Sequence, residues 1–200
     1  MKKSLLAVIL ATTVASASFQ ANAAVGHTWN VGVGLGISTI NDSDLDWSHT
    51  RDDSSATQYK TYLEYNFNDY IGLGFDLSYF ENTDNYNNPR AIPSQGKADW
   101  KTTTLGTYAK IAYPLDQIGS DIFVKLGIAY NSFEVKCTDT SSYDDTVASA
   151  LLGIGGNYKF TQNIGVRVGV DYNSNVHHYR WNEDAKEKTY TYYAAFDYTF

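Results

Sequence analysis

The expected fold follows from one stretch of the chain, Tyr190-Thr191-Tyr192-Tyr193-Ala194-Ala195-Phe196-Asp197-Tyr198-Thr199-Phe200. Its even-numbered positions are aromatic except for one alanine, and its odd-numbered positions are small or polar except for one tyrosine. Side chains of a β-strand alternate between two faces, so the stretch predicts a strand with one aromatic face. A bilayer-spanning strand needs about ten residues and one apolar face. In water such a stripe would be exposed at a fraying terminus, so we expect this strand to lie in a membrane.

Seven earlier segments alternate with the same period of two residues. They are residues 29–38, 59–67, 71–80, 103–113, 122–130, 148–160 and 164–172. One such segment is a weak signal, but eight in succession predict an all-β fold, an eight-stranded antiparallel up-and-down transmembrane β-barrel. In this fold the last strand pairs with the first, at residues 29–38, and closes the barrel.

The connections between these segments alternate in length. Those at 68–70, 114–121 and 161–163 are short, whereas those at about 39–58, 81–102, 131–147 and 173–189 are long and polar. Outer-membrane barrels have short turns on the side of both termini and long loops opposite. A soluble eight-stranded barrel of the lipocalin type is the alternative, with its apolar residues inside. The polar faces here are rich in glycine and charge and cannot line an apolar cavity, which favours the membrane barrel.

The beginning of the chain reads as a secretory signal peptide over residues 1–23. Lys2 and Lys3 precede a short apolar run at 5–14, and Ala21-Asn22-Ala23 provides small residues for cleavage after Ala23. A membrane anchor is the alternative, but the apolar run is too short to span a bilayer. The barrel domain is therefore expected over residues 24–200.

Charge and cysteine content narrow the possible partners. Without residues 1–23 the chain has 13 basic and 22 acidic residues, a net charge of −9, which argues against nucleic acid as a partner. Cys137 is the single cysteine, so no internal disulfide can form; a bridge between chains stays open, and we expect a monomer. The 17 tyrosines suit a membrane–water interface, because each has an apolar ring and a polar tip.

The polar faces of the predicted strands carry four acidic and four basic residues. They are Lys60, Glu64, Asp76, Lys110, Lys125, Arg167, Asp171 and Asp197. The interior of an eight-stranded barrel is just wide enough for side chains, so these charges are expected to form a balanced network. Asp76, Lys110 and Arg167 lie mid-strand and are expected at its centre. Filling and neutralising the lumen is the favoured role, and an ion or proton path is the alternative.

No catalytic or metal site is expected, and no cofactor. Ser174, His177 and His178, with Glu183 and Asp184, all fall in one predicted loop, whereas a barrel hydrolase needs its triad placed on strand rims. The adjacent histidines lack the spacing of a structural metal site. The run Asp42-x-Asp44-x-Asp46 lacks the glycine and the distal glutamate of an EF-hand.

Residues 104–175 resemble the transmembrane domain of the OmpA family. The likeness is clearest in Tyr108-Ala109-Lys110-Ile111-Ala112-Tyr113-Pro114, in residues 158–161 and in Ile164-Gly165-Val166-Arg167-Val168-Gly169-Val170-Asp171-Tyr172, and residues 71–79 extend it. The resemblance implies an eight-stranded barrel with a lumenal charge network. In it Asp76, Lys110 and Arg167 take the positions of the family's acidic gate residue, lysine and arginine. Asn157 stands where the family has a second glutamate.

The resemblance also carries expectations about assembly and domain content. Phe200, with Tyr198 and Phe196 behind it, is expected to be the signal read by the outer-membrane assembly machinery. The sequence stops at Phe200, so the peptidoglycan-binding periplasmic domain of full-length OmpA is expected to be absent, as in small OmpX-like and colonisation-factor barrels.

These observations together predict a barrel in the outer membrane of a Gram-negative bacterium, with both termini in the periplasm. Its expected partners are outer-membrane lipid, lipopolysaccharide and the assembly machinery. The four long loops, which are acidic and contain Trp47 and Trp100, are expected to meet a host or environmental surface. A structural or surface-interaction role is favoured. A narrow, low-conductance pore is the first alternative and a lipid-modifying enzyme the second.

Overall fold

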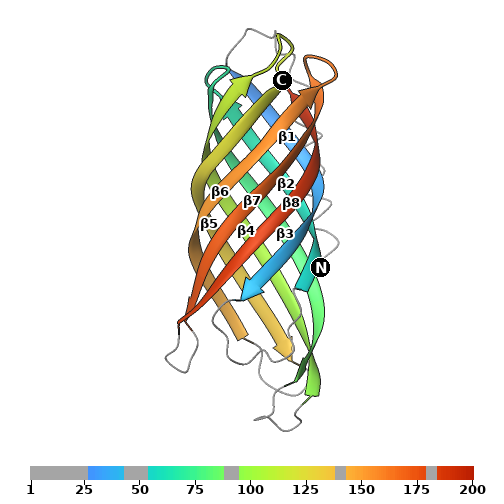
Figure 1. The fold of residues 1–200 in the computed structure, drawn as a ribbon, viewed down its shortest axis with the longest axis vertical. Helices are drawn as coiled ribbons and strands as arrows, with labels where there is room; N and C mark the ends of the chain where they lie inside the picture. The colour runs from blue at the N-terminus through green and yellow to red at the C-terminus, as the bar shows by residue number, and fades with distance from the viewer. Residues whose placement is uncertain (1–26, 43–53, 88–94, 138–142, 179–183) are drawn as a thin grey trace.

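The computed structural model describes residues 27–42, 54–87, 95–137, 143–178 and 184–200. These residues form eight antiparallel strands that close into one up-and-down barrel, which confirms the predicted fold (Figure 1). The strands are β1 (Thr28–Asp42), β2 (Ser54–Asn66), β3 (Ile71–Asn87), β4 (Gln95–Pro114), β5 (Asp121–Cys137), β6 (Tyr143–Lys159), β7 (Ile164–His178) and β8 (Asp184–Thr199). Within the described ranges, no helix is long and apolar enough to cross a membrane.

The barrel closes between β1 and β8, as the alternating pattern predicts. Gly36 pairs with Tyr193 in the middle of this ladder. At the ladder's end, Trp29 and Phe200 each donate a backbone N–H to the other's carbonyl, both at 2.9 Å. Closure leaves the membrane-spanning strands without an open edge, which is a condition for a sheet to exist in hydrocarbon.

The alternating faces point as expected for a membrane barrel. Outward-facing apolar side chains such as Phe75 and Ile154 are 59% and 62% exposed, whereas inward-facing Glu64 and Arg167 are 0% and 1% exposed. A soluble barrel would have the opposite distribution. The apolar outer surface is therefore the face that contacts lipid.

Aromatic side chains form a girdle at each end of this apolar band. The turn-side girdle comprises Trp29, Tyr65, Phe67, Tyr70, Tyr113, Tyr158 and Phe160. The loop-side girdle comprises Tyr59, Tyr79, Tyr130, Tyr172 and Tyr190. Rings of neighbouring strands touch in both, as in Trp29–Tyr65 at 4.9 Å and Tyr172–Tyr190 at 5.1 Å between centroids. Such girdles mark the two membrane–water interfaces.

The three predicted short turns are confirmed, and all lie at the end of the barrel where β8 ends, uppermost in Figure 1. Side-chain oxygens stabilise each of them. Asn68 Oδ1 accepts the backbone N–H groups of Tyr70 and Ile71, both at 2.8 Å. Thr161 Oγ1 accepts the N–H of Ile164 at 3.0 Å. These contacts are the Asx and Ser/Thr turns that suit tight connections.

At the opposite end the strands are longer than the sequence predicts. Strands β3 to β6 contain 17, 20, 17 and 17 residues, so parts of the predicted loops 81–102 and 131–147 are strand. The prediction ended each strand where outward apolar residues stop. Outside the bilayer a ladder needs no apolar face, because backbone hydrogen bonding alone can continue it.

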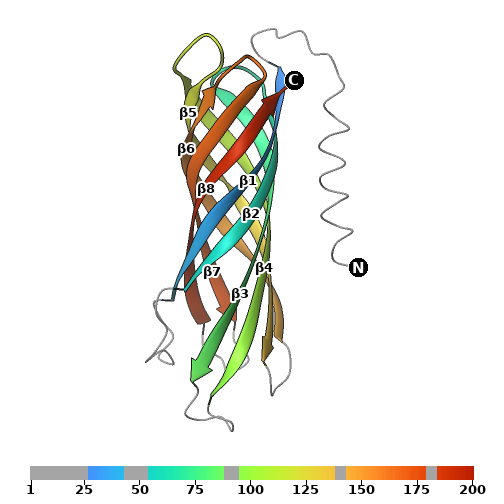
Figure 2. The same ribbon diagram turned by 90° about the vertical axis from the view of Figure 1, so that its right-hand side faces the viewer.

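Beyond the loop-side girdle the barrel divides into two sheets. The β2–β3 ladder stops at Gln58–Phe80 and the β6–β7 ladder at Ala150–Ser174. The ladder between β3 and β4 continues to Asn87–Gln95. One sheet therefore consists of the ends of β3 to β6, and the other of β7, β8, β1 and β2. In Figure 2 the lower ends of β3 and β4 extend past those of β1 and β2.

Candidate functional site: the charged lumen

All eight charged residues singled out in the sequence point into the barrel and are at most 6% exposed. Lys159 and Asp121 join them, which gives five acidic and five basic side chains. The ion pairs between these side chains divide them into a turn-side cluster and a middle cluster, and each cluster is neutral in formal charge.

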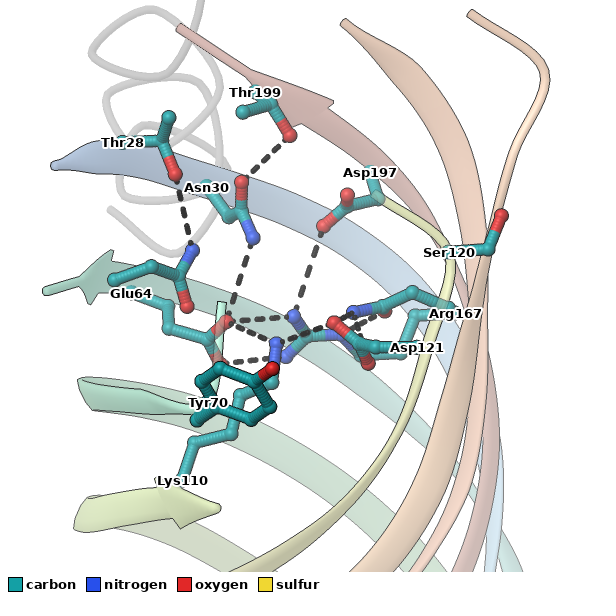
Figure 3. A network of polar contacts seen from close by, with 12 residues as sticks. Thr28, Asn30, Glu64, Tyr70, Lys110, Ser120, Asp121, Arg167, Asp197 and Thr199 are labelled. Atoms are coloured by element: carbon teal, nitrogen blue, oxygen red, sulfur yellow. Dashed lines mark hydrogen bonds and ion pairs between the residues drawn. The ribbon is translucent and has the colours of Figure 1, made fainter. Parts of the chain in front are cut away.

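Glu64 on β2 is the hub of the turn-side cluster. Arg167 on β7 donates from Nη1 and Nη2 to its two carboxylate oxygens, both at 3.0 Å (Figure 3). Lys110 Nζ on β4 donates to the same carboxylate at 3.0 Å, and the Tyr108 hydroxyl donates at 3.2 Å. A bidentate guanidinium–carboxylate pair is the strongest ion-pair geometry that proteins use.

A second acid completes the surroundings of Lys110 and Arg167. Asp121, the first residue of β5, lies 2.9 Å from Lys110 Nζ. Asn157 connects the two sides, because its Nδ2 donates to Asp121 at 3.0 Å while its Oδ1 accepts from Arg167 Nε at 2.7 Å. An amide that donates and accepts at once satisfies both charged neighbours.

Asp197 on β8 closes this cluster toward the β1–β8 seam. Lys159 pairs with its carboxylate, and the Tyr62 hydroxyl donates to it at 2.5 Å. The turn-side cluster therefore contains three acids and three bases: Glu64, Asp121, Asp197, Lys110, Lys159 and Arg167.

The middle cluster is a square of two lysines and two aspartates. Lys60 Nζ lies 2.8 Å from Asp76 and 3.0 Å from Asp171, whereas Lys125 Nζ lies 2.7 Å from Asp171 and 3.6 Å from Asp76. Lys125 is the direct ladder partner of Lys110, which is a repulsive arrangement for like charges. The two lysines avoid each other because each turns toward the acids of a different cluster.

Aromatic rings pack beside both clusters and cover their cations. The Arg167 guanidinium lies 4.0 Å from the centroid of Tyr62, and Lys125 Nζ lies 4.9 Å from that of Tyr108. Glycines make space for these rings: a Cβ at Gly32 would lie 2.1 Å from Tyr62, and one at Gly74 would lie 2.4 Å from Tyr108. The glycines of the alternating pattern thus permit large side chains to fill the lumen.

On the loop side of the middle cluster, uncharged polar groups bond to one another across neighbouring strands. The Ser38 hydroxyl donates to Gln58 at 2.6 Å and lies 2.9 Å from the Thr191 hydroxyl. Asn131 on β5 accepts from Thr104 at 2.7 Å and donates to Ser149 at 2.8 Å. The charges therefore occupy the turn-side and middle levels, and hydroxyl and amide groups occupy the next level.

The expected centre of Asp76, Lys110 and Arg167 is wrong in one member. Lys110 and Arg167 do meet, but the acid between them is Glu64, while Asp76 belongs to the middle cluster. Asp76 pairs with Tyr62 in the β2–β3 ladder, and Tyr62 lies two residues farther from the turn than Glu64 does. Alternation predicts which face a residue occupies, but the level at which it meets other strands depends on the register.

Two members of the network, Asp121 and Lys159, were not in the predicted set. Lys159 shares the inward face of β6 with Asn157, and Asp121 shares that of β5 with Lys125. Asp121 lies one residue before the predicted segment 122–130, whereas Lys159 lies inside the predicted segment 148–160. Alternation alone places Lys159 on the inward face, and extending the segment 122–130 by one residue does the same for Asp121.

The other predicted residues lie apart from the lumen. Phe196 is 52% exposed on the lipid face of β8, and Tyr198 and Phe200 follow on that face. Ser174, His177 and His178 belong to β7 and Asp184 to β8, so the predicted loop 173–189 is largely strand. Asp44, Asp46, Trp47 and Glu183 lie outside the described residues. Among the residues that are described, no three His, Cys, Asp or Glu side chains form a metal-binding group.

Comparison with known proteins agrees with this architecture. A family model described as the outer membrane protein beta-barrel domain matches residues 6–200. No curated protein sequence matches the chain.

Three similar solved structures are small outer-membrane barrels. Neisserial surface protein A has a TM-score of 0.64 and 16% identity, covering 86% of this chain and 97% of its own. OprG from Pseudomonas aeruginosa has a TM-score of 0.62 and 15% identity, covering 88% and 97%. Ail, the attachment invasion locus protein of Yersinia pestis, solved with the heparin analogue sucrose octasulfate, has a TM-score of 0.56 and 12% identity, covering 87% and 100%. At these identities the likeness shows the fold.

Proposed function

This chain belongs to the outer-membrane β-barrel domain family, and from that premise we propose that it makes contacts at the bacterial surface rather than transporting a solute. In this proposal the periplasmic side of the barrel is the one with the short turns, where β1 begins and β8 ends. The longer strands and the connections between them then face the exterior.

The observation that carries the proposal is the extension of β3 to β6 beyond the loop-side girdle. On β3 the girdle residue is Tyr79, yet the strand continues to Asn87, and on β4 it begins at Gln95. A strand needs about ten residues to cross a bilayer, so roughly half of β4 is in excess of that requirement. Strands that project past the membrane present a rigid surface to whatever lies outside.

The outer face of this projecting sheet is polar and charged. Glu81 and Lys101 are ladder partners joined at 3.1 Å, and Glu134, the ladder partner of Lys101 on β5, lies 2.6 Å from Lys136. Such a surface suits a polar ligand in water. The outer parts of β3 and β6 form the two edges of this sheet, because their ladders with β2 and β7 have already stopped. An extended polypeptide can add to a sheet edge as a further strand.

The charged lumen supports the same assignment. A narrow pore is the alternative, and it would require an ion to pass between these charges. Ten side chains form two neutral clusters in which each acid has a cationic partner, so removing any one side chain would leave its cluster with a net buried charge. Paired charges of this kind resist the entry of a hydrated ion. Ail shares the architecture, and its name refers to attachment and invasion.

The test shortens the projecting hairpins without disturbing the membrane part. Residues 82–100 and 135–143 are each replaced by Asn-Gly, a two-residue turn that joins the ladder partners Glu81–Lys101 and Glu134–Asp144. Full-length and shortened proteins in lipid nanodiscs are then compared for binding to cultured epithelial cells. The full-length protein is expected to bind, and the doubly shortened protein to lose that binding.

The matched control shortens the hairpin of the other sheet. Replacing 176–186 with Asn-Gly joins the ladder partners Asn175 and Glu187, and this variant is expected to keep its binding. The proposal fails if the full-length protein binds cells no better than empty nanodiscs. It also fails if the doubly shortened protein, still folded, binds as well as the full-length one.

A further inference from the structure

The lipid-facing surface of the barrel contains a shallow apolar groove of about 840 Å³ across β6, β7, β8 and β1. The groove lies on the outer face of the closed sheet, away from the lumenal clusters and from the projecting strands.

The floor of the groove is one row of ladder partners that crosses four strands. Gly155 pairs with Gly169, Gly169 with Tyr193, and Tyr193 with Gly36. All four residues direct their side-chain positions inward, so the outer surface along this row is bare backbone. The groove therefore runs perpendicular to the strands between two rows of outward-facing side chains.

The two walls of the groove differ in height. The wall on the loop side is continuous, with the large side chains of Ile154, Val170, Tyr192 and Ile37. On the turn side the equivalent positions are Gly156, Val168, Ala194 and Leu35. Gly156 and Ala194 leave two gaps, so the groove is closed toward the loop end and open toward the turn end.

Because the strands are tilted, the groove crosses the hydrocarbon core obliquely. Its β6 end, at Gly156, lies two residues from Tyr158 of the turn-side girdle, and its other end, at Thr57, lies two residues beyond Tyr59 of the loop-side girdle. Ala194 is midway along β8 between Tyr190 of the loop-side girdle and Tyr198 near its turn-side end. The groove is continuous with the lipid-facing band of the barrel. Thr57 is the one polar residue of its lining that faces outward. Hydrocarbon chains are the material that this depth supplies.

We propose that the groove binds one acyl chain of a phospholipid from the leaflet on the turn side of the membrane, which is the periplasmic leaflet in the orientation proposed above. The chain enters through the gaps at Gly156 and Ala194 and lies on the glycine floor against the continuous wall. Within a bilayer such binding is driven by van der Waals packing, which small residues favour by permitting close approach.

Shape and access favour this occupant over the others. A neighbouring barrel has a convex surface that would rest on the groove's rims without entering it. A lipid of the opposite leaflet meets the closed wall formed by Val170 and Tyr192.

The experiment fills the groove and measures retained lipid. Ala194→Phe places a ring in a gap where a Cβ already exists. Ala109→Phe is the control, because Ala109 is a lipid-facing alanine of β4 outside the groove. Each protein is reconstituted in vesicles containing phosphatidylethanolamine and lipopolysaccharide, extracted in mild detergent and examined by native mass spectrometry.

Wild type and Ala109→Phe are expected to retain one phosphatidylethanolamine, and Ala194→Phe to lose it. The inference is overturned if Ala194→Phe retains phospholipid to the same extent as wild type, if wild type retains none, or if the retained molecule is lipopolysaccharide. Gly156→Ala, which narrows the other gap, is expected to reduce retention as well. It keeps the test decisive if the phenylalanine variant does not fold.

Discussion

At the scale of single residues, Glu64 shows how much one buried carboxylate contributes. It is fully buried and accepts hydrogen bonds from Arg167 and Lys110 together. Glu64→Ala would leave two buried cations short of a partner, and breaking a buried pair in this way costs about 3–5 kcal/mol. Urea unfolding of the barrel in lipid vesicles measures the loss.

Glu81→Ala is the matched control for that substitution. Glu81 also pairs with a lysine, Lys101 at 3.1 Å, but its side chain is 49% exposed. Exposed pairs contribute about 0–1 kcal/mol, so this variant should unfold at nearly the wild-type urea concentration. Equal losses for Glu64→Ala and Glu81→Ala would contradict the central position given to Glu64.

Most of the lumenal residues could be predicted from the sequence, but their partners could not. Alternation alone places Glu64, Asp76 and Arg167 on inward faces. Arg167 meets Glu64, which lies 103 residues earlier in the chain. Their meeting depends on the registers of the five ladders between β2 and β7. No local pattern contains this information.

At the scale of one strand, β3 shows why its glycines matter. A Cβ at Gly74 would lie 2.4 Å from the Tyr108 ring across the ladder. Gly74→Ala is therefore expected to destabilise the barrel by about 1–3 kcal/mol, the usual cost of overpacking. The measurement is again urea unfolding in vesicles.

The double substitution Gly74→Ala/Tyr108→Leu tests the cause of that loss. Removing the ring removes the clash, so the two substitutions together should destabilise less than the sum of each alone. Strict additivity would mean that the cost of Gly74→Ala does not come from Tyr108.

The turn between β4 and β5 contains a carboxylate outside the membrane span that should respond to pH. Hydrogen bonds from Ser120 and from the backbone N–H of Ile118 hold the pKa of Asp116 below its usual range. A depressed folded-state pKa means that this contribution is present above the unfolded pKa and is lost as pH falls through the folded one.

NMR titration of the Ser120 amide in micelles measures this behaviour. The midpoint should fall below the value of about 3.9 of an unperturbed aspartate. Asp116→Asn should abolish the titration while its amide oxygen retains the turn. A wild-type midpoint at or above about 3.9 would contradict the proposed role of these hydrogen bonds.

The strands also show where the sequence stops being informative. The eight membrane-crossing segments have an apolar face, so their existence and order could be predicted. The outer parts of β3 to β6 have none, and residues 82–87 and 95–102 carry the composition of a loop. Their strand structure comes from pairing with neighbouring strands that are themselves anchored in the barrel.

At the scale of the whole molecule, the part of the barrel that holds the two neutral clusters differs in role from the strands beyond the loop-side girdle. The turn-side and middle levels of the lumen are filled by paired charges and aromatic rings, so we expect the barrel to act as a closed scaffold. Contact with the surroundings is then left to the strands beyond the loop-side girdle.

Single-channel recording in planar bilayers tests this division of tasks most directly. The folded wild-type protein, inserted at known density, is compared with Arg167→Ala/Glu64→Ala, which removes the bidentate pair from the turn-side cluster. The account predicts no discrete conductance steps for wild type, and none for the double variant, because the middle cluster still fills the lumen in that variant. Discrete, reproducible ion conductance through the wild-type barrel would contradict the account.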